Sequence, residues 1–115
     1  MANLTGFKRD NNGAYIEKHP DANIQYGVDF TDYLNSGDGV ASATITIQTI
    51  TGDSSPLRFP TNAATDVIIT GAAVVGIRLI GGTTDNIYNV DVKIVTEDGD
   101  TDSRRFRVII GPKHL

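Results

Sequence analysis

Residues 88–95, Tyr-Asn-Val-Asp-Val-Lys-Ile-Val, and residues 105–110, Arg-Phe-Arg-Val-Ile-Ile, are the stretches that decide the fold class. In both runs apolar side chains recur at every second position, which is the period of a strand with one buried face. The Asp98-Gly99 step between the two runs favours a tight hairpin. The pattern therefore predicts two antiparallel strands whose core-facing positions include Tyr88, Val90, Val92, Phe106 and Val108.

The remainder of the chain has strand character as well. We predict strands at residues 14–19, 40–51, 66–70 and 74–80, which are separated by turn residues, and the stretch 40–51 is rich in β-branched residues. No long helix lies between them, which argues against a parallel sheet with helical crossovers. The sequence thus indicates an all-β, antiparallel sandwich. We expect it to be immunoglobulin-like, although the disulfide and buried Trp of antibody domains are missing.

One short helical turn is expected over residues 29–34. Asp29 is of a type that caps helix N-termini. Phe30, Tyr33 and Leu34 follow at the spacing that places side chains on one helical face. A turn of this length is not stable alone, so we expect it to pack on the sheets.

Length and composition predict one domain preceded by an extension. A chain of 115 residues can bury one core. Residues 1–13 are polar and end in Asn-Asn-Gly, so we predict an N-terminal arm that docks on a partner, followed by a single domain over residues 14–115. The chain has no cysteine, which excludes disulfides and thiolate metal sites.

Charge and hydropathy exclude two kinds of partner. The formal net charge is −4, and the basic pairs Lys8-Arg9 and Arg104-Arg105 stand among acidic residues, whereas nucleic-acid binding requires clustered basic side chains. No stretch approaches the ~20 apolar residues of a membrane-spanning helix, and residues 1–10 lack the apolar segment of a secretion signal. We therefore expect neither a nucleic-acid nor a membrane partner.

An acidic cluster in the predicted hairpin resembles part of a calcium loop. Asp98, Asp100 and Asp102 have the 1, 3, 5 spacing of such a loop, but Ser103 stands where a glycine is required and Ile109 where a glutamate is required. A hairpin turn explains the same residues more simply.

The other candidates for chemistry are equally incomplete. Asp29 and Asp32 could form a carboxylate pair, but they are better explained as the first turn of the expected helix. His19 and His114 are the only histidines, and a metal site needs more ligands. Residues 81–84, Gly-Gly-Thr-Thr, lack the lysine of a phosphate-binding loop. We therefore predict no catalytic residue, no metal site, no cofactor and no enzymatic activity.

Aromatic residues gather in the first third of the chain, which is also its least regular part. Aromatic side chains often anchor protein interfaces, but they can equally cover one end of a sandwich. Both interpretations stay open for this group, whose candidate interface residues are Tyr15, Tyr26, Phe30, Tyr33 and Leu34.

Several short motifs follow one another in a characteristic order. They are Lys18-His19-Pro20-Asp21, residues 26–34 (Tyr-Gly-Val-Asp-Phe-Thr-Asp-Tyr-Leu), Gly37-Asp38, Gly81-Gly82, Tyr88-x-Val90, Thr96-x-x-Gly99 and residues 104–108. The series resembles a family of small tailed-phage structural proteins, the phage fibre–tail adaptors, over residues 18–110. Two positions depart from the family pattern: His19 replaces an Asp, and Asp100 stands where the family often has Arg.

This resemblance implies a virion protein with an immunoglobulin-like fold, no enzymatic activity and contacts to neighbouring virion proteins. Our leading hypothesis is an adaptor at the tail, neck or fibre attachment site, present in multiple copies in a symmetric assembly. We expect the arm and residues 26–34 to make the docking contacts. The alternatives are a capsid decoration or cement protein and a surface carbohydrate-binding module, for which Tyr15 and Tyr88 are the available aromatic residues.

Overall fold

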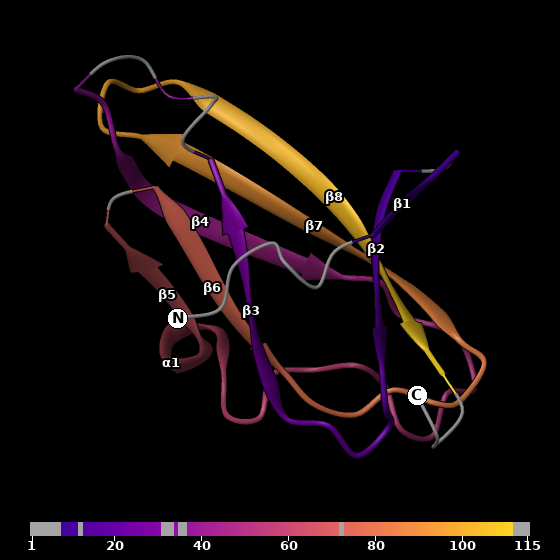
Figure 1. The fold of residues 1–115 in the computed structure, drawn as a ribbon. Helices are drawn as coiled ribbons and strands as arrows, with labels where there is room; N and C mark the ends of the chain where they lie inside the picture. The colour runs from indigo at the N-terminus through magenta and orange to yellow at the C-terminus, as the bar shows by residue number, and fades with distance from the viewer. Residues whose placement is uncertain (1–7, 12, 31–33, 35–36, 72, 112–115) are drawn as a thin grey trace.

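Two β-sheets packed face to face form the protein (Figure 1). The structure is a computed structural model that describes residues 8–11, 13–30, 34, 37–71 and 73–111. In chain order its elements are β1 (Lys8–Asp10), β2 (Gly13–Lys18), β3 (Ile24–Asp29), β4 (Val40–Ile47), α1 (Ala63–Asp66), β5 (Val67–Thr70), β6 (Val74–Leu79), β7 (Ile87–Thr96) and β8 (Thr101–Ile110). The chain is therefore an all-β sandwich, as predicted, and the one helical turn in its described part is α1.

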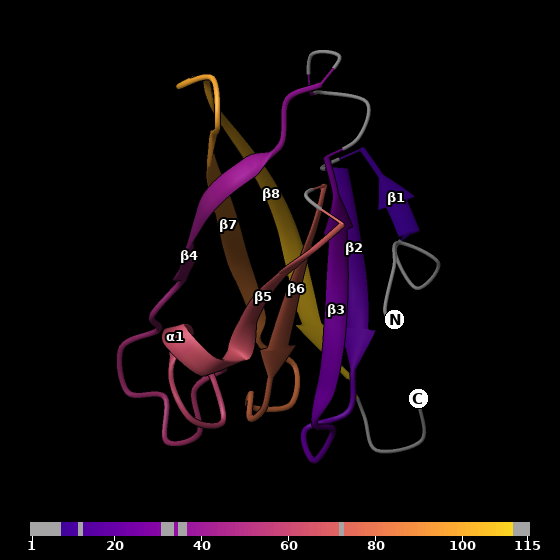
Figure 2. The same ribbon diagram turned by 90° about the vertical axis from the view of Figure 1, so that its left-hand side faces the viewer.

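The larger sheet has the strand order β1-β2-β8-β7-β4, and the smaller sheet has the order β3-β6-β5. Neighbouring strands are antiparallel except β2 and β8, which run parallel, with Tyr15 opposite Arg107 and Lys18 opposite Ile110. Figure 2 shows β1 and β4 at opposite edges of the larger sheet. The first and last strands of the domain are thus held side by side in the middle of one sheet.

The core lies between β7 of the larger sheet and β6 of the smaller sheet. Tyr88, Val90, Val92 and Ile94 of β7 are fully buried, as are Val75, Ile77 and Leu79 of β6. Burying each such side chain stabilises the fold by roughly 1.5–3 kcal/mol relative to leaving it exposed. The five residues assigned to the core from the sequence, Tyr88, Val90, Val92, Phe106 and Val108, are all buried.

Strand β3 extends into the start of the predicted helical turn, because Asp29 is its last residue and is paired with Val74. The sequence prediction omits β3, although Ile24, Tyr26 and Val28 alternate with more polar residues as strand residues do. Residues 31–33 lie outside the described part of the chain, and the described helical turn is α1, which was not predicted.

The immunoglobulin-like assignment stays a prediction that the strand order supports. If β2 is counted as the first strand, the smaller sheet consists of the second (β3), fifth (β6) and fourth (β5) strands. The third (β4), sixth (β7) and seventh (β8) strands lie together in the larger sheet. Immunoglobulin domains distribute these strands in the same way. The departure from the constant-type pattern is β2, which pairs with the last strand instead of the second.

The Gly81-Gly82 motif allows the loop after β6 to approach its neighbours closely. Both glycines have positive φ angles, 80° at Gly81 and 101° at Gly82. A Cβ atom on Gly81 would lie 2.5 Å from the carbonyl oxygen of Pro56, and one on Gly82 would lie 2.4 Å from Cδ1 of Ile110. The motif is therefore explained by packing, without a phosphate ligand.

We predict that Gly81→Ala lowers the free energy of unfolding by about 2–4 kcal/mol, because positive-φ strain adds to a collision with backbone. Gly52→Ala is the matched control, since Gly52 has a φ of 82° and nothing within 4 Å of its Cβ position. That control should lose only about 1–2 kcal/mol. Denaturant unfolding of the two variants measures the difference, and equal losses would contradict this account of the motif.

Candidate functional site

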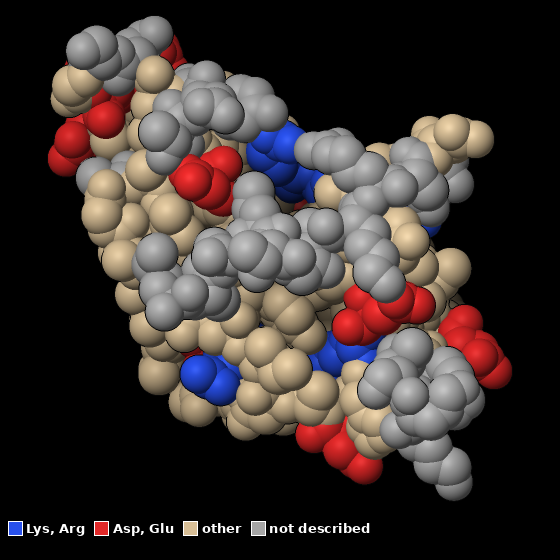
Figure 3. Space-filling view, in the orientation of Figure 1, with Lys and Arg blue, Asp and Glu red and all other residues tan. Residues whose placement is uncertain are grey.

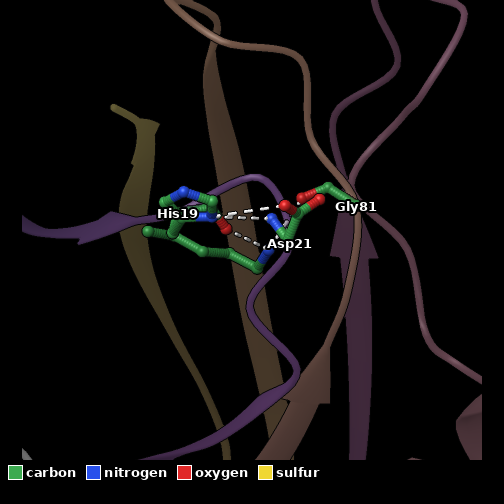
Figure 4. A network of polar contacts seen from close by, with 4 residues as sticks. His19, Asp21 and Gly81 are labelled. Atoms are coloured by element: carbon green, nitrogen blue, oxygen red, sulfur yellow. Dashed lines mark hydrogen bonds and ion pairs between the residues drawn. The ribbon is translucent and has the colours of Figure 1, made fainter. Parts of the chain in front are cut away.

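Lys18 joins three segments at the end of the sandwich where β2 ends. Its side chain is 1% exposed, and Nζ donates hydrogen bonds to the carbonyl oxygens of His19 at 3.0 Å and Gly81 at 2.8 Å (Figure 4). The Lys18 carbonyl accepts a hydrogen bond from the Gly111 amide at 3.0 Å. Burial lowers the pKa of Lys18, with the charge of Asp21 opposing this effect and that of Arg58 adding to it. A buried ammonium group bound to backbone carbonyls is a structural device that ties β2 to the β6–β7 loop.

His19 shapes the turn that follows Lys18. The Asp21 amide donates a hydrogen bond to Nδ1 of His19 at 3.0 Å (Figure 4), and the Ala22 amide donates to the His19 carbonyl at 3.0 Å. Pro20 occupies the second position of this turn, where its fixed φ angle is favourable. His19 accepts the hydrogen bond that an Asp side chain would accept in such a turn. His19 in place of the Asp in the pattern that the sequence resembles is therefore compatible with the same local structure.

Tyr88 anchors the loop that connects the two sheets at this same end. Its ring is fully buried, while its hydroxyl donates a short hydrogen bond to Asp53 and accepts one from the Thr83 amide at 3.2 Å. The Thr83 hydroxyl also donates to Asp53, whose carboxylate in turn accepts from the Ser55 amide at 3.1 Å. A Tyr at the start of this strand that bonds backbone a few residues upstream is a tyrosine corner.

Asp38 fastens the opposite end of the sandwich, where the β7–β8 hairpin turns. Its Oδ1 accepts hydrogen bonds from the amides of Gly39 at 2.8 Å and Asp98 at 3.1 Å. Within the hairpin, the Asp100 amide donates to Oγ1 of Thr96 at 3.0 Å. The Gly37-Asp38 and Thr96-x-x-Gly99 motifs, which are far apart in the sequence, are therefore two halves of one contact.

These hydrogen bonds favour ionised carboxylates at both ends. The hydroxyls of Thr83 and Tyr88 hold the pKa of Asp53 below its ordinary value. At Asp38, desolvation acts to raise the pKa, but hydrogen bonds from the Thr96 side chain and from neighbouring backbone amides outweigh it, and the pKa is lowered. Both residues thus stabilise the fold more at neutral pH than in acid.

The candidate interface residues do not form one exposed surface. Phe30 is fully buried, and Tyr26 and Leu34 are half-buried and pack against the core. Burial raises the pKa of Tyr26 to about 12, and its buried hydroxyl has no hydrogen-bond partner among the described residues. Tyr33 lies outside the described residues.

Tyr15 is placed differently, on the outer face of the larger sheet. The guanidinium carbon of Arg107 lies 5.2 Å from the centre of the Tyr15 ring, which is a cation–π distance. Arg107 also donates a hydrogen bond to the Gly13 carbonyl at 3.2 Å. The pair gives this face of the sheet a half-buried aromatic and basic position beside β1.

A shallow polar hollow of about 280 Å³ lies on the same outer face. Across it, Arg105 donates two hydrogen bonds to the Asp91 carboxylate, at 2.6 and 3.1 Å, and so lowers the pKa of Asp91. An exposed ion pair of this kind contributes little stability. The hollow contains no aromatic side chain on which a sugar could stack, since its lining consists of Thr46, Gln48, Asn89, Asp91 and Arg105.

Two residues of the acidic cluster, Asp98 and Asp102, take part in hydrogen bonds at the β7–β8 hairpin. The Asp98 amide binds Asp38, and Oδ1 of Asp102 accepts a hydrogen bond from the Ser103 amide at 2.8 Å. Asp32 and His114 lie outside the described residues. Over the described ranges, no group of three or more His, Asp and Glu side chains could hold a metal ion. The described residues also include no helix long and apolar enough to cross a membrane.

Charge on the face seen in Figure 3 is scattered. Basic and acidic side chains alternate there in small groups, without a continuous basic patch among the residues that the structure describes. The arrangement agrees with a chain of net charge −4, in which 14 Asp and Glu residues outnumber 10 Lys and Arg residues.

Residues 18–109 match the family model described as podophage GP4 fiber-tail adaptor protein gp77. The chain belongs to this family. The match begins at Lys18 and ends in β8, so it includes both the Lys18–Gly81 contact and the Asp38–hairpin contact. Membership makes the protein a structural adaptor of the phage tail and a component of the virion, and it confirms the resemblance found in the sequence. A search of curated proteins found no match to this adaptor.

We predict that acid weakens the adaptor through Asp53. Because its pKa is depressed in the folded state, the stability it contributes is present above the unfolded-state value of ~3.9 and is lost as the pH falls through the folded-state value. Asp53→Asn should therefore be less stable than the parent at about pH 7 and should lose less stability on acidification to about pH 3.

Denaturant unfolding at several pH values measures this effect. Asp98→Asn is the control, because the Asp98 side chain is exposed and its amide, which binds Asp38, is unchanged. The same pH dependence in the Asp53→Asn variant and the parent would contradict the role assigned to Asp53.

Proposed function

We propose that this chain is a non-enzymatic joint that holds a fibre on the phage tail, in multiple copies arranged with the symmetry of the tail. The observation that carries the proposal is the match to the fibre–tail adaptor family, which extends over almost the whole sandwich. A structural role requires a stable shape that presents fixed surfaces, and needs no reactive group.

The construction of the domain supports a joint that bears load. The first and last strands are paired side by side through four residue pairs, from Tyr15–Arg107 to Lys18–Ile110. Side-chain hydrogen bonds fasten the loops at each end, through Lys18 and Asp53 at one end and Asp38 at the other. Pulling on either terminus would load several hydrogen bonds at once.

For docking we propose the N-terminal arm, residues 1–13, together with the outer face around Tyr15. β1 is the edge strand of the larger sheet, and its first residue, Lys8, is paired with Tyr15. The segment over residues 26–34 remains a second proposed contact. Within it Phe30 is buried, so any contribution of that residue would be indirect, through the backbone that it supports.

Cryo-electron microscopy of the intact particle tests the function. We expect density for this sandwich at the fibre attachment site of the tail, in a ring with the symmetry of the tail. Density spread over the capsid lattice would make the protein a decoration or cement protein and would contradict the proposal. Density exposed at the tips of the fibres would instead favour a carbohydrate-binding module.

We predict that deletion of residues 1–10 weakens docking without unfolding the domain. The deletion removes the arm and the three-residue strand β1, but it retains Gly13, whose carbonyl binds Arg107. The melting temperature should fall by about 5 °C or less, since few contacts are lost.

Binding to tail particles that lack this protein should fall at least ~tenfold, a loss of about 1.4 kcal/mol. The intact chain in the same binding assay is the reference. Undiminished binding, or a collapse of thermal stability, would refute the docking role of the arm.

A further inference from the structure

Strand β4 presents an unusual open edge. It is the last strand of the larger sheet, and within the described part of the chain no strand pairs with it on the side away from β7 (Figure 2). Residues 40–52, Val-Ala-Ser-Ala-Thr-Ile-Thr-Ile-Gln-Thr-Ile-Thr-Gly, contain no charged residue and no proline. Soluble proteins usually protect an edge strand with lysines, prolines or a short length. The only such device in β4 is a register shift between Val40 and Ser42.

The direction of the free backbone groups follows from the ladder with β7. The backbone N–H of Gln48 donates to the backbone carbonyl of Asn89 at 2.9 Å, so Gln48 and Asn89 form a hydrogen-bonded pair of the ladder. Hydrogen-bonded and non-hydrogen-bonded pairs alternate along an antiparallel ladder. The groups of Thr46 and Thr44 therefore face β7, and the N–H and C=O groups of Ala43, Ile45 and Ile47 face the open edge.

We infer that the β4 edge pairs antiparallel with the β4 edge of a second copy of this chain, about a two-fold axis at Ile45. In this register Ile45 lies opposite Ile45 of the second copy, and Ala43 lies opposite its Ile47. By symmetry Ile47 also lies opposite Ala43 of the second copy. These three pairs use backbone groups that face the open edge, so each is a hydrogen-bonded pair. The two five-stranded sheets join into one continuous sheet, with the core-facing side chains of both copies on the same side.

The sequence of the edge favours a second copy over a charged partner strand. Around Ile45 the strand is nearly self-complementary, with Thr44 and Thr46 on either side and Ala43 and Ile47 beyond them. In a two-fold dimer the same strand of each copy is in contact, so a charged side chain near the axis would lie close to the same charge of the second copy. The absence of charge from residues 40–52 removes that repulsion in a chain whose net charge is −4.

The other edges are less suited to this pairing. β1 has three residues, all charged, and β3 ends in Asp29. β5 has four residues, whereas β4 has eight. A two-fold contact uses the β4 edge of each copy once, so it joins copies in pairs and any ring must form through other surfaces. The pairing of β4 can therefore hold true whether or not the protein connects fibre and tail.

Analytical ultracentrifugation of the full chain over a wide concentration range tests the pairing. The contact is smaller than a standard protein interface, so we expect a reversible dimer at high concentration. Ala43→Pro should give a monomer with nearly unchanged thermal stability, because the lost N–H faces the open edge and proline is tolerated there. Thr44→Pro should lower the melting temperature, because its N–H binds β7.

A charge pair tests the register without proline. In the proposed dimer Thr44 lies opposite Thr46 of the second copy in a non-hydrogen-bonded pair, where side chains are closest. Thr44→Lys with Thr46→Lys places like charges opposite each other, whereas Thr44→Glu with Thr46→Lys places opposite charges there. Both positions are exposed, and the two double variants should differ on the order of tenfold in dimer dissociation constant.

The results of these experiments show whether the β4 edge binds a second copy of this chain or a strand from another protein. A concentration-dependent dimer that is lost in Ala43→Pro and discriminates between the two double variants supports the proposal. A parent chain that stays monomeric at every concentration overturns it and leaves the edge to a strand from another protein. A dimer that Ala43→Pro leaves intact, or that treats both double variants alike, also overturns it, because it must then use another surface or register.

Discussion

Burial of one face of β7 is the interaction on which the rest of the structure depends. Four successive inward positions of this strand, from Tyr88 to Ile94, are fully buried against the opposite sheet. Because side chains alternate, a slip of one residue would move all four to the solvent side and bring Asn89, Asp91 and Lys93 into the core. That penalty sets the register of β7, and β7 in turn sets the registers of β4 and β8 on either side of it.

The positions of the loops at the ends of the sandwich then depend on polar groups near this core that need hydrogen-bond partners. The Tyr88 hydroxyl cannot be left unpaired at the end of a buried strand, and Asp53 and Thr83 supply its partners. The ammonium group of Lys18 needs partners for the same reason, because it is buried, and it binds two carbonyl oxygens. Most of the short motifs by which the sequence resembles the adaptor family are thus hydrogen-bonding or close-packing positions that fasten the sandwich.

An adaptor is defined by the surfaces that a rigid core leaves free. The outer face of the larger sheet is polar, with the Tyr15–Arg107 pair near one edge and the uncharged β4 at the other. The two edges therefore differ in chemistry: charged residues form β1, whereas Ala, Ser, Thr, Ile and Val form β4. A domain with unlike edges can use one edge for a second copy of itself, as inferred for β4, and leave the other for a different partner.

The sequence by itself determined the all-β class, the β7–β8 hairpin and the core-facing set from Tyr88 to Val108, because alternation of apolar residues is a local property that each strand displays alone. The sequence also contained, in the characteristic order, the short motifs that resemble the adaptor family. Alternation was equally present at Ile24, Tyr26 and Val28, but the helical spacing of Phe30, Tyr33 and Leu34 competed with it, and strand β3, which ends at Asp29, was not predicted. Only the tertiary structure decided that Phe30 belongs to the core, that Asp53 binds Tyr88 across 35 positions of sequence and that Asp38 binds the hairpin across 60. These contacts join segments that are distant in the chain, and no local period or spacing specifies which distant groups will meet once the two sheets have packed.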